Sequence, residues 1–510
     1  MNSKATPFLS HDQYPKEAVI LENLTTNFMT DASLIPLRME NGILQVVMEN
    51  PSDTDTIEAL QFAFDLEIEI FQGKREDIQE AIERLYGAGS QSIETIIEEA
   101  GRDVYEISAD LDADTEHLRD MASEAPIIRL VNRLILNAVE MRASDIHFEP
   151  FEDQFRVRYR IDGVLHEAES PPKRLQAAVI SRVKIMSKLD IAERRLPQDG
   201  RIKLKIADRE IDFRVSTIPT LYGESLVMRI LDRETLVLDL DRLGFPSEML
   251  EAYARLISQP YGMILVTGPT GSGKTSTLYT TLARINSPES KIVTLEDPVE
   301  YQLKGINQIQ VNPKIGLTFA GGLRSIVRQD PDIILVGEIR DRETAEIAVQ
   351  SALTGHLLFS TLHTNDSAGA ITRLLDMGVE NFLLSSTLLG IMAQRLVRVN
   401  CPDCKETVRP DEKLVRAMNL TDAEREEIVF YAGVGCDNCR ATGFKGRTAI
   451  FEYLEVDEHI RRGIVTGATS DSIRQAAVGK GMTTLREDGW RKVREGLTTI
   501  PEVLRVTLDN

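Results

Sequence analysis

The 510-residue sequence has few aromatic side chains, a single Trp and a deficit of positive charge. Phe, Trp and Tyr make up 5% of the chain, and 59 Lys and Arg face 80 Asp and Glu, a formal net charge of −21. Proteins that follow nucleic acid without sequence preference need a basic groove lined with stacking aromatic rings. The composition therefore argues against a nucleic-acid motor, and we expect no nucleic-acid partner.

Long hydrophobic runs are also missing. No stretch of about 18 uninterrupted apolar residues offers a membrane span, and the first residues, MNSKATPFLSHDQYPKEAV, contain no charged-then-apolar targeting segment. We therefore expect a soluble protein of the cytosol. At about 150 residues per domain, the length predicts three to four domains and excludes a single small module.

The negative charge is concentrated at the amino end. Residues 1–125 contain 8 Lys and Arg against 27 Asp and Glu, a net charge of −19. Residues 126–510 contain 51 against 53, a net charge of −2. The simplest interpretation of the acidic residues 1–125 is a solvated surface. The more specific alternative is that they dock to a basic partner.

Turn signals and apolar periodicity predict a small α/β domain over residues 1–90. Asn41-Gly42 joins two alternating runs, a pair typical of a two-residue hairpin turn. Residues 91–124 are acidic and mostly polar, so we expect a linker there, with a solvated helix as the alternative. The expected elements are a strand over 66–71 and helices over 54–63, 75–85 and 92–100.

A second α/β domain is predicted over residues 125–235. It opens at Ala125 with a helix whose apolar residues recur at helical spacing, and Asp162-Gly163 joins two strands. The strand before that turn alternates apolar residues with Arg156, Arg158 and Arg160, which places the arginines on one face. A helix over 172–188 and strands over 200–206, 210–217 and 226–231 complete this domain.

From residue 236, apolar strands alternate with helices, which predicts a largely parallel sheet covered by helices over residues 236–396. The expected strands are 262–267, 291–296, 306–311, 332–338 and 357–363. A cysteine-containing subdomain is expected at 397–445, and a mostly helical part at 446–510.

A phosphate-binding loop directly follows the strand MILVT. Its glycines let backbone N–H groups point at a β-phosphate beside the positive end of the next helix. Lys274 supplies a charge to the β- and γ-phosphates, and the Thr275 hydroxyl is suited to Mg²⁺. We therefore predict ATP and Mg²⁺ as ligands. The loop residues are Gly268, Pro269, Thr270, Gly271, Ser272, Gly273, Lys274 and Thr275.

Acidic residues and histidines follow the other apolar strands. In DIILVGE, Gly337 stands where a metal-holding Asp is usual, so Glu338 is the best candidate to polarise the attacking water. Glu296 and Asp297 end a second strand and are candidates to share this role. His363 ends a third strand and His356 precedes it, although an isolated His is more often structural than catalytic.

The four cysteines form two C-x-x-C pairs, Cys401/Cys404 and Cys436/Cys439. Two residues between thiols fit a tight turn that points both sulfur atoms at one metal ion. We therefore predict a structural tetrahedral Zn²⁺ site. The 31 residues between the pairs favour an inserted subdomain. Two disulfides or a redox role are the alternatives, and the reducing cytosol argues against the first.

Together these units predict a multidomain α/β protein. It has a RecA-like phosphate-loop NTPase core, a preceding α/β domain, a small N-terminal α/β domain and a Cys₄ zinc subdomain.

Several motifs over residues 125–510 resemble the secretion-superfamily ATPases, and within them the type II secretion ATPases. They are RASDIHFEP, AERRLPQDGR, DFRVSTIPTLYGE, GPTGSGKT, TLEDPVEY, LRSIVRQDPDIILVGEIRD, TGHLLFSTLHTNDS, the paired C-x-x-C motifs and GMTTLREDGWRKVREGLTT. The set is more specific than a phosphate loop alone.

The resemblance implies a homohexameric ring in which the preceding α/β domain closes over the nucleotide. By position, Arg201 and Arg214 resemble the arginines that this domain lends to the phosphates, and Arg324 and Arg328 resemble further phosphate or subunit contacts. Glu296 and Asp297 match the family's acidic box, and His356 and His363 match its histidine box. Glu338 matches the family's glutamate that replaces the usual metal-holding Asp.

The resemblance also implies a cytoplasmic ATPase, peripheral at the inner membrane, that drives pseudopilus assembly for type II secretion. Expected partners are the cytoplasmic domain of an inner-membrane protein of the general secretion pathway protein L type, bound through residues 1–125, and an inner-membrane platform protein. A type IV pilus assembly ATPase is the main alternative. A pilus retraction motor and a nucleotide sensor without turnover are less favoured.

Overall fold

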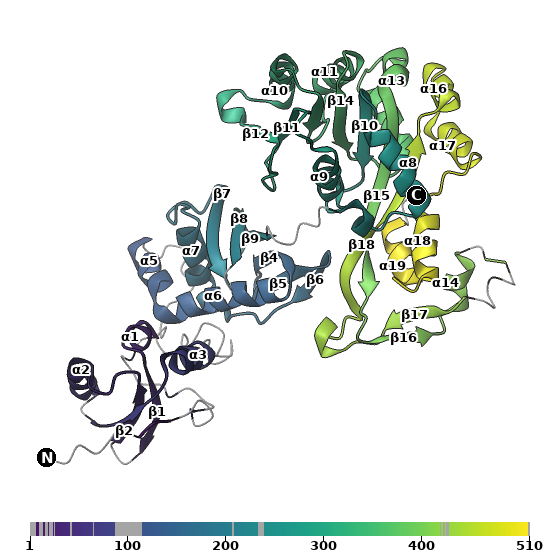
Figure 1. Cartoon of the computed structure of the whole chain (residues 1–510). Helices are drawn as coiled ribbons and strands as arrows, with labels where there is room; N and C mark the ends of the chain where they lie inside the picture. Colours follow the sequence, from purple (N-terminus) through teal and green to yellow (C-terminus); the bar gives the residue numbers. More distant parts are fainter. Residues whose placement is uncertain are drawn as a thin grey trace. The chain divides into compact units, whose positions relative to one another are not determined.

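The computed structural model describes residues 26–40, 43–64, 66–86, 115–206, 209–232, 239–418 and 428–507, together with positions 7–9, 14, 15, 19, 24, 420, 421 and 424. The chain separates into two compact units, residues 1–231 and 232–510 (Figure 1). None of the helices in these ranges combines the length and the apolar character of a membrane-spanning segment.

A three-stranded sheet forms the centre of the N-terminal domain, in the order β1-β2-β3. β1 and β2 pair antiparallel, as the predicted hairpin requires, and β2 and β3 pair in parallel. Leu44 and Val46 of β2 share a core with Leu60 and Ile78 of the helices. Asn41-Gly42 and the expected helix over 92–100 lie outside the described residues. The elements are α1 (Thr26–Asp31), β1 (Leu34–Glu40), β2 (Ile43–Met48), α2 (Thr54–Phe64), β3 (Glu67–Gln72) and α3 (Arg75–Tyr86).

The second domain begins earlier than the sequence suggests. Thr115–Ser123 forms helix α5, and its Leu118, Met121 and Ala122 are buried. The end of the segment expected to be a linker, 91–124, is therefore a packed helix, because three apolar residues at helical spacing bury one face against the domain. Helix α6 (Ala125–Glu140) follows, as predicted.

Six strands form the sheet of this domain, in the order β6-β5-β4-β9-β8-β7. Phe155, Val157 and Tyr159 of β5 are buried, whereas Arg158 on the opposite face pairs with Glu149 at 2.7 Å. The predicted alternation and the turn between β5 and β6 are confirmed. The elements are β4 (Ala143–Pro150), β5 (Phe155–Ile161), β6 (Val164–Glu167), α7 (Gln176–Met186), β7 (Gln198–Ile206), β8 (Arg209–Thr220) and β9 (Gly223–Asp232).

A seven-stranded sheet organises the second compact unit, in the order β12-β11-β13-β14-β10-β15-β18. Its strands pair in parallel except β18, which pairs antiparallel with β15. The predicted parallel sheet is confirmed, and β15 and β18 are strands that were not expected. The strands are β10 (Gly262–Thr267), β11 (Ile292–Glu296), β12 (Asn307–Gln310), β13 (Ile333–Val336), β14 (Leu357–Leu362), β15 (Leu388–Asn400) and β18 (Phe444–Glu455).

Both faces of this sheet are covered. Met263 and Leu265 of β10 belong to one hydrophobic core, and Ile264 and Val266 belong to another, so successive residues alternate between the two faces. This double burial explains the uninterrupted apolar strands in the sequence. The helices are α8 (Ser247–Ile257), α9 (Lys274–Ile285), α10 (Phe319–Ile326), α11 (Arg342–Leu353), α12 (Ser367–Asp376) and α13 (Asn381–Thr387).

The cysteine-containing module is an insertion between β15 and β18 of the same sheet. The boundary expected at 396 therefore falls within β15, and the sheet of the ATPase domain continues to Glu455. Four helices follow β18, in agreement with the predicted helical end. The elements are β16 (Lys405–Val408), α14 (Glu412–Arg416), β17 (Phe430–Gly433), α16 (Glu458–Val465), α17 (Ser470–Val478), α18 (Leu485–Arg494) and α19 (Ile500–Thr507).

A buried carboxylate fastens α19 to β15. The Glu502 side chain is 1% exposed and accepts hydrogen bonds from Arg398 Nη2 at 2.9 Å and from Arg505 Nη2 at 2.6 Å. Burial raises the pKa of a carboxyl group, but the hydrogen bonds from the two arginines outweigh burial and lower the pKa of Glu502 to about 2. The ionised carboxylate therefore stabilises the folded state.

We predict that Glu502→Gln lowers the free energy of unfolding by about 3 kcal/mol at pH 7. Because the pKa of Glu502 is lowered on folding, this contribution is present above about pH 4.5 and is lost as the pH falls towards 2. The difference between variant and parent should shrink over that range. Urea titration can be followed through Trp490, which is 6% exposed and packs with the α19 residues Ile500 and Val503.

The matched control is Glu458→Gln. Its ion pair with Arg462 is an i,i+4 surface pair with side chains 72% and 74% exposed, so we expect a change of less than about 0.5 kcal/mol. Equal effects of the two variants, or a Glu502→Gln difference that persists at pH 2, would contradict the assigned role of Glu502.

Candidate nucleotide-binding site

The predicted phosphate loop joins the carboxyl end of β10 to helix α9 (Figure 1). Gly268 and Gly273 have φ angles of 148° and 90°, and a side chain at either position would collide with β15. A Cβ atom on Gly268 would lie 2.6 Å from the Gln394 carbonyl oxygen, and one on Gly273 would lie 2.7 Å from Gln394 Nε2. Backbone conformation and close approach both require glycine here.

Lys274 is the first residue of α9 and is 9% exposed. Its Nζ donates to the carbonyl oxygens of Gly268 at 2.7 Å and Pro269 at 3.1 Å. Burial lowers the pKa of Lys274 to about 8, with Glu338 opposing and Arg395 adding to this effect. Its two carbonyl acceptors place the ammonium group inside the loop. Phosphate oxygens of a bound nucleotide would replace these acceptors.

Two further features of the loop fit a phosphate ligand. The Ser272 hydroxyl is buried and has no hydrogen-bond partner within the described part of the chain. Helix α9 begins without a side-chain cap, which leaves the N–H groups of its first turn for an anion. Thr275 is exposed in that turn.

Glu338 and His363 come together beside the loop, as predicted from their strand ends. The Glu338 side chain is 17% exposed, forms an ion pair with Arg340 and lies 3.4 Å from His363 Nε2. Burial acts to raise the pKa of Glu338, but the Arg340 hydrogen bond and charge, aided by His363, lower it. Glu338 is therefore an ionised acceptor at the carboxyl edge of the sheet.

The two acidic residues at the end of β11 have different surroundings. Asp297 is exposed, whereas Glu296 is 4% exposed and accepts hydrogen bonds from Thr294 Oγ1 at 2.5 Å and Gln308 Nε2 at 3.2 Å. Tyr279 of α9 donates a further hydrogen bond to the Glu296 carboxylate. Glu296 therefore ties β11, β12 and α9 together, and its catalytic role stays a prediction.

The structure also describes His356, Arg324 and Arg328. His356 precedes β14, whereas His363 follows it, so the two histidines lie at opposite ends of the strand; His356 Nδ1 is 2.8 Å from the Ser351 carbonyl oxygen. Arg324 forms an ion pair with Glu343 at 2.6 Å. Arg328 is exposed and precedes β13.

Arg201 and Arg214 face each other on β7 and β8 as register partners. They belong to the first compact unit, and their predicted contact with nucleotide stays a prediction.

The four cysteines converge, as the C-x-x-C spacing predicts. All four thiols are free of disulfides, and their sulfur atoms lie within 4.8 Å of one another. Sulfur atoms of Cys404 and Cys439 are 3.7 Å apart, and those of Cys401 and Cys436 are 3.9 Å apart. Four thiolates at about 2.3 Å from a tetrahedral metal ion are separated by about 3.8 Å, so the cluster fits such an ion.

Backbone N–H groups surround these sulfur atoms. Gly435 N donates to Cys404 Sγ, and Cys436 N and Gly443 N donate to Cys439 Sγ, at 3.2–3.3 Å. Burial acts to raise the pKa of Cys439, but the backbone hydrogen bonds from Cys436 and Gly443 lower it to about 6. This favours the thiolate form of Cys439, the form that binds metal, whereas burial raises the pKa values of Cys401 and Cys404.

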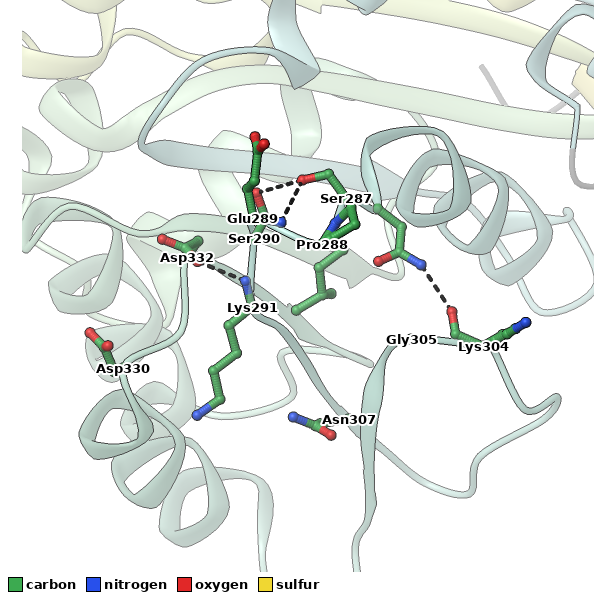
Figure 2. A pocket seen from close by; sticks show the side chains of 12 residues that line it. Ser287, Pro288, Glu289, Ser290, Lys291, Lys304, Gly305, Asn307, Asp330 and Asp332 are labelled. Atoms are coloured by element: carbon green, nitrogen blue, oxygen red, sulfur yellow. Dashed lines mark hydrogen bonds between the residues drawn. The ribbon is translucent and has the colours of Figure 1, made fainter.

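A cavity of about 620 Å³ lies at the amino ends of β11, β12 and β13, the edge opposite the phosphate loop. Figure 2 shows Lys291 and Asp332 on one side of it and Lys304 on the other. It includes no loop residue, so it is separate from the nucleotide site.

Sequence reasoning missed Gln394 and Arg395 of β15. Both are buried under the phosphate loop, at 2% and 7% exposure. Their only signal is a polar pair inside the apolar run LLGIMAQRLV.

Residues 120–505 match the family model described as type II/IV secretion system protein, and residues 5–92 match the MshEN domain. The type II secretion system protein E of Xanthomonas campestris is 52% identical over 499 residues, 98% of this chain and 87% of that protein. The type IV pilus assembly ATPase PilB of Myxococcus xanthus is 45% identical over 98% of this chain and 90% of its own length.

The fold is also found among solved structures. The ATPase DotB of Legionella pneumophila aligns over 74% of this chain and 95% of its own, with a TM-score of 0.55 and 21% identity.

Proposed function

The chain belongs to the type II/IV secretion system protein family, and we propose that it is a Mg²⁺-dependent homohexamer that couples ATP hydrolysis to pseudopilus assembly. Its activity is that of an ATPase of type II secretion. The observation that carries the proposal is the complete phosphate loop, with buried Lys274 inside it and ionised Glu338 beside it.

Each group at this edge has a chemical task in the proposal. The loop N–H groups and Lys274 hold the β- and γ-phosphates, and Thr275 is the residue that would hold Mg²⁺, which would neutralise developing charge. Glu338 orients and polarises the attacking water, and His363 and Arg340 fix the carboxylate that does so. Arg201 and Arg214 add positive charge when their domain closes over the nucleotide.

The acidic N-terminal domain is the proposed adaptor. Its net charge suits a basic surface on the cytoplasmic domain of an inner-membrane secretion protein, of the general secretion pathway protein L type. The ATPase would then work in the cytoplasm, peripheral at the inner membrane, and act on the platform protein there.

Assembly of type IV pili is the second candidate function, because the pilus assembly ATPase PilB matches over nearly the whole chain. Co-purification with secretion-platform proteins supports the first function, and co-purification with pilus proteins supports the second.

We predict that Lys274→Ala lowers ATP turnover by about a thousandfold, because one preorganised donor to developing charge is worth about 10²–10³ in rate. The fold should be retained, as judged by unchanged Trp490 emission. Lys304→Ala, an exposed lysine away from the loop, is the control and should leave turnover unchanged. Near-normal hydrolysis by Lys274→Ala would refute the assigned site.

We propose Zn²⁺ as the ion of the Cys₄ cluster and predict about one zinc per chain by metal analysis, because binding at such sites supplies on the order of 10 kcal/mol to local folding. Chelation should alter the emission of Trp490, which packs in one core with Phe430 of β17. Cys404→Ser should lower the zinc content. Less than about half a zinc per chain, with no response to chelation, would contradict this proposal.

Docking of the adaptor should weaken as salt rises, because the screening length falls from about 10 Å at 0.1 M to about 3 Å at 1 M. The measurement is capture of the full chain on the partner's cytoplasmic domain at both salt concentrations. A chain that lacks residues 1–90, and so keeps the packed helix α5, should not bind at either. Salt-insensitive docking would instead indicate an apolar interface.

A further inference from the structure

Strand β15 passes beneath the phosphate loop and carries two buried polar residues that the catalytic proposal does not use. β15 pairs in parallel with β10, with Ala393 opposite Thr267. Gln394 and Arg395 therefore lie just past the last residue of β10, where the loop begins. A buried guanidinium costs free energy unless its hydrogen bonds are made, so its contacts indicate why it is there.

Gln394 contacts both ends of the loop. A side chain on Gly268 would collide with the Gln394 carbonyl oxygen, and a side chain on Gly273 would collide with the Gln394 side chain. Gln394 Oε1 also accepts a hydrogen bond from Thr277 Oγ1 of α9 at 2.8 Å. The loop and the first turn of its helix therefore rest on this strand.

Arg395 ties strand β15 to the histidine segment, residues 363–365, and lies close to the loop. Its Nη1 donates to the Gln394 carbonyl oxygen at 3.0 Å, and its Nη2 donates to the Asn365 carbonyl oxygen at 2.8 Å. A Cβ atom on Gly268 would lie 3.1 Å from Arg395 Nη1. The guanidinium group is thus packed between the first glycine of the loop and the backbone of Asn365.

The histidine segment has a second attachment beside the loop. Thr364 N donates to Thr267 Oγ1 at 2.9 Å, and the two threonine hydroxyl oxygens are 2.7 Å apart. Thr267 immediately precedes Gly268. One residue before Thr364, His363 reaches Glu338 at 3.4 Å. The loop, the histidine segment and Glu338 therefore form one connected set.

We propose that Arg395 is a positioning residue for ATP hydrolysis, which holds the histidine segment against the phosphate loop and so fixes His363 on Glu338. The proposal rests on the proposed ATPase mechanism and adds a residue to it. A guanidinium group suits the task because its planar fork donates in fixed directions to two carbonyl groups at once. A lysine keeps the charge but cannot bridge both carbonyls with that geometry.

The test is steady-state hydrolysis by the full chain, with kcat and KM measured separately. Arg395→Gln should lower kcat by about 10–100-fold, the range typical of lost catalytic positioning, and should change the KM for ATP by less than about threefold. Arg395→Lys should stay at least about tenfold low in kcat, because charge alone does not restore the bridge. Arg373→Gln, an exposed arginine of α12, is the control and should match the parent.

Hydrogen exchange gives a readout that does not depend on turnover. Amides of residues 363–366 should exchange faster in Arg395→Gln than in the parent, while amides of β10 keep their protection. Thr364→Val removes the neighbouring hydroxyl contact and should also lower kcat with little change in KM, so the proposal remains testable if Arg395→Gln does not fold.

Unchanged kcat in Arg395→Gln, a rise in KM alone, or full recovery in Arg395→Lys would overturn the positioning role. The role would also be overturned if the fraction of unfolded variant fully accounted for its loss of kcat. An inactive parent chain would instead refute the proposed ATPase. An active parent with an unaffected Arg395→Gln variant would refute only the present inference.

Discussion

Parallel pairing of strands is the constraint on which the nucleotide site depends. β10 pairs in parallel with β14 and β15, and β13 pairs in parallel with β11 and β14. Their carboxyl ends consequently meet at one edge of the sheet, where ligands of such folds bind. The phosphate loop, Glu338 and His363 each follow a different strand, so strand register alone brings them together. Every side-chain contact at the site refines an arrangement that the backbone hydrogen bonds have already imposed.

The parts of the fold that could be predicted from sequence are those with local causes. Strands buried on both faces are uninterrupted apolar runs, and turns such as Asp162-Gly163 adopt positive φ angles that these residues tolerate. Helix α5 was harder, because only Leu118, Met121 and Ala122 form its apolar face and acidic residues surround them. β18 was missed because its partner β15 lies across the cysteine-containing insertion, so no short turn signal joins the two strands.

The candidate site shows the same division. The phosphate loop is contiguous in sequence and was identified in full, as were the paired cysteines. The surroundings of Glu296 could not be foreseen, since its partners Tyr279 and Gln308 come from a helix before it and a strand after it. The role of Arg395 could not be predicted for a similar reason. Its acceptor is the backbone carbonyl group of Asn365, which is distant in sequence, and every residue type has such a group.

β15 has a further consequence, because one continuous strand connects the two chemical centres of this unit. Gln394 lies under the phosphate loop, and Cys401 begins one residue after the strand ends. At about 3.3 Å per residue, roughly 23 Å separate them along a stiff, hydrogen-bonded rod. β10 and β18 flank this strand and hold its register. The cysteine cluster and the support of the phosphate loop therefore belong to one continuous strand and the residue that follows it.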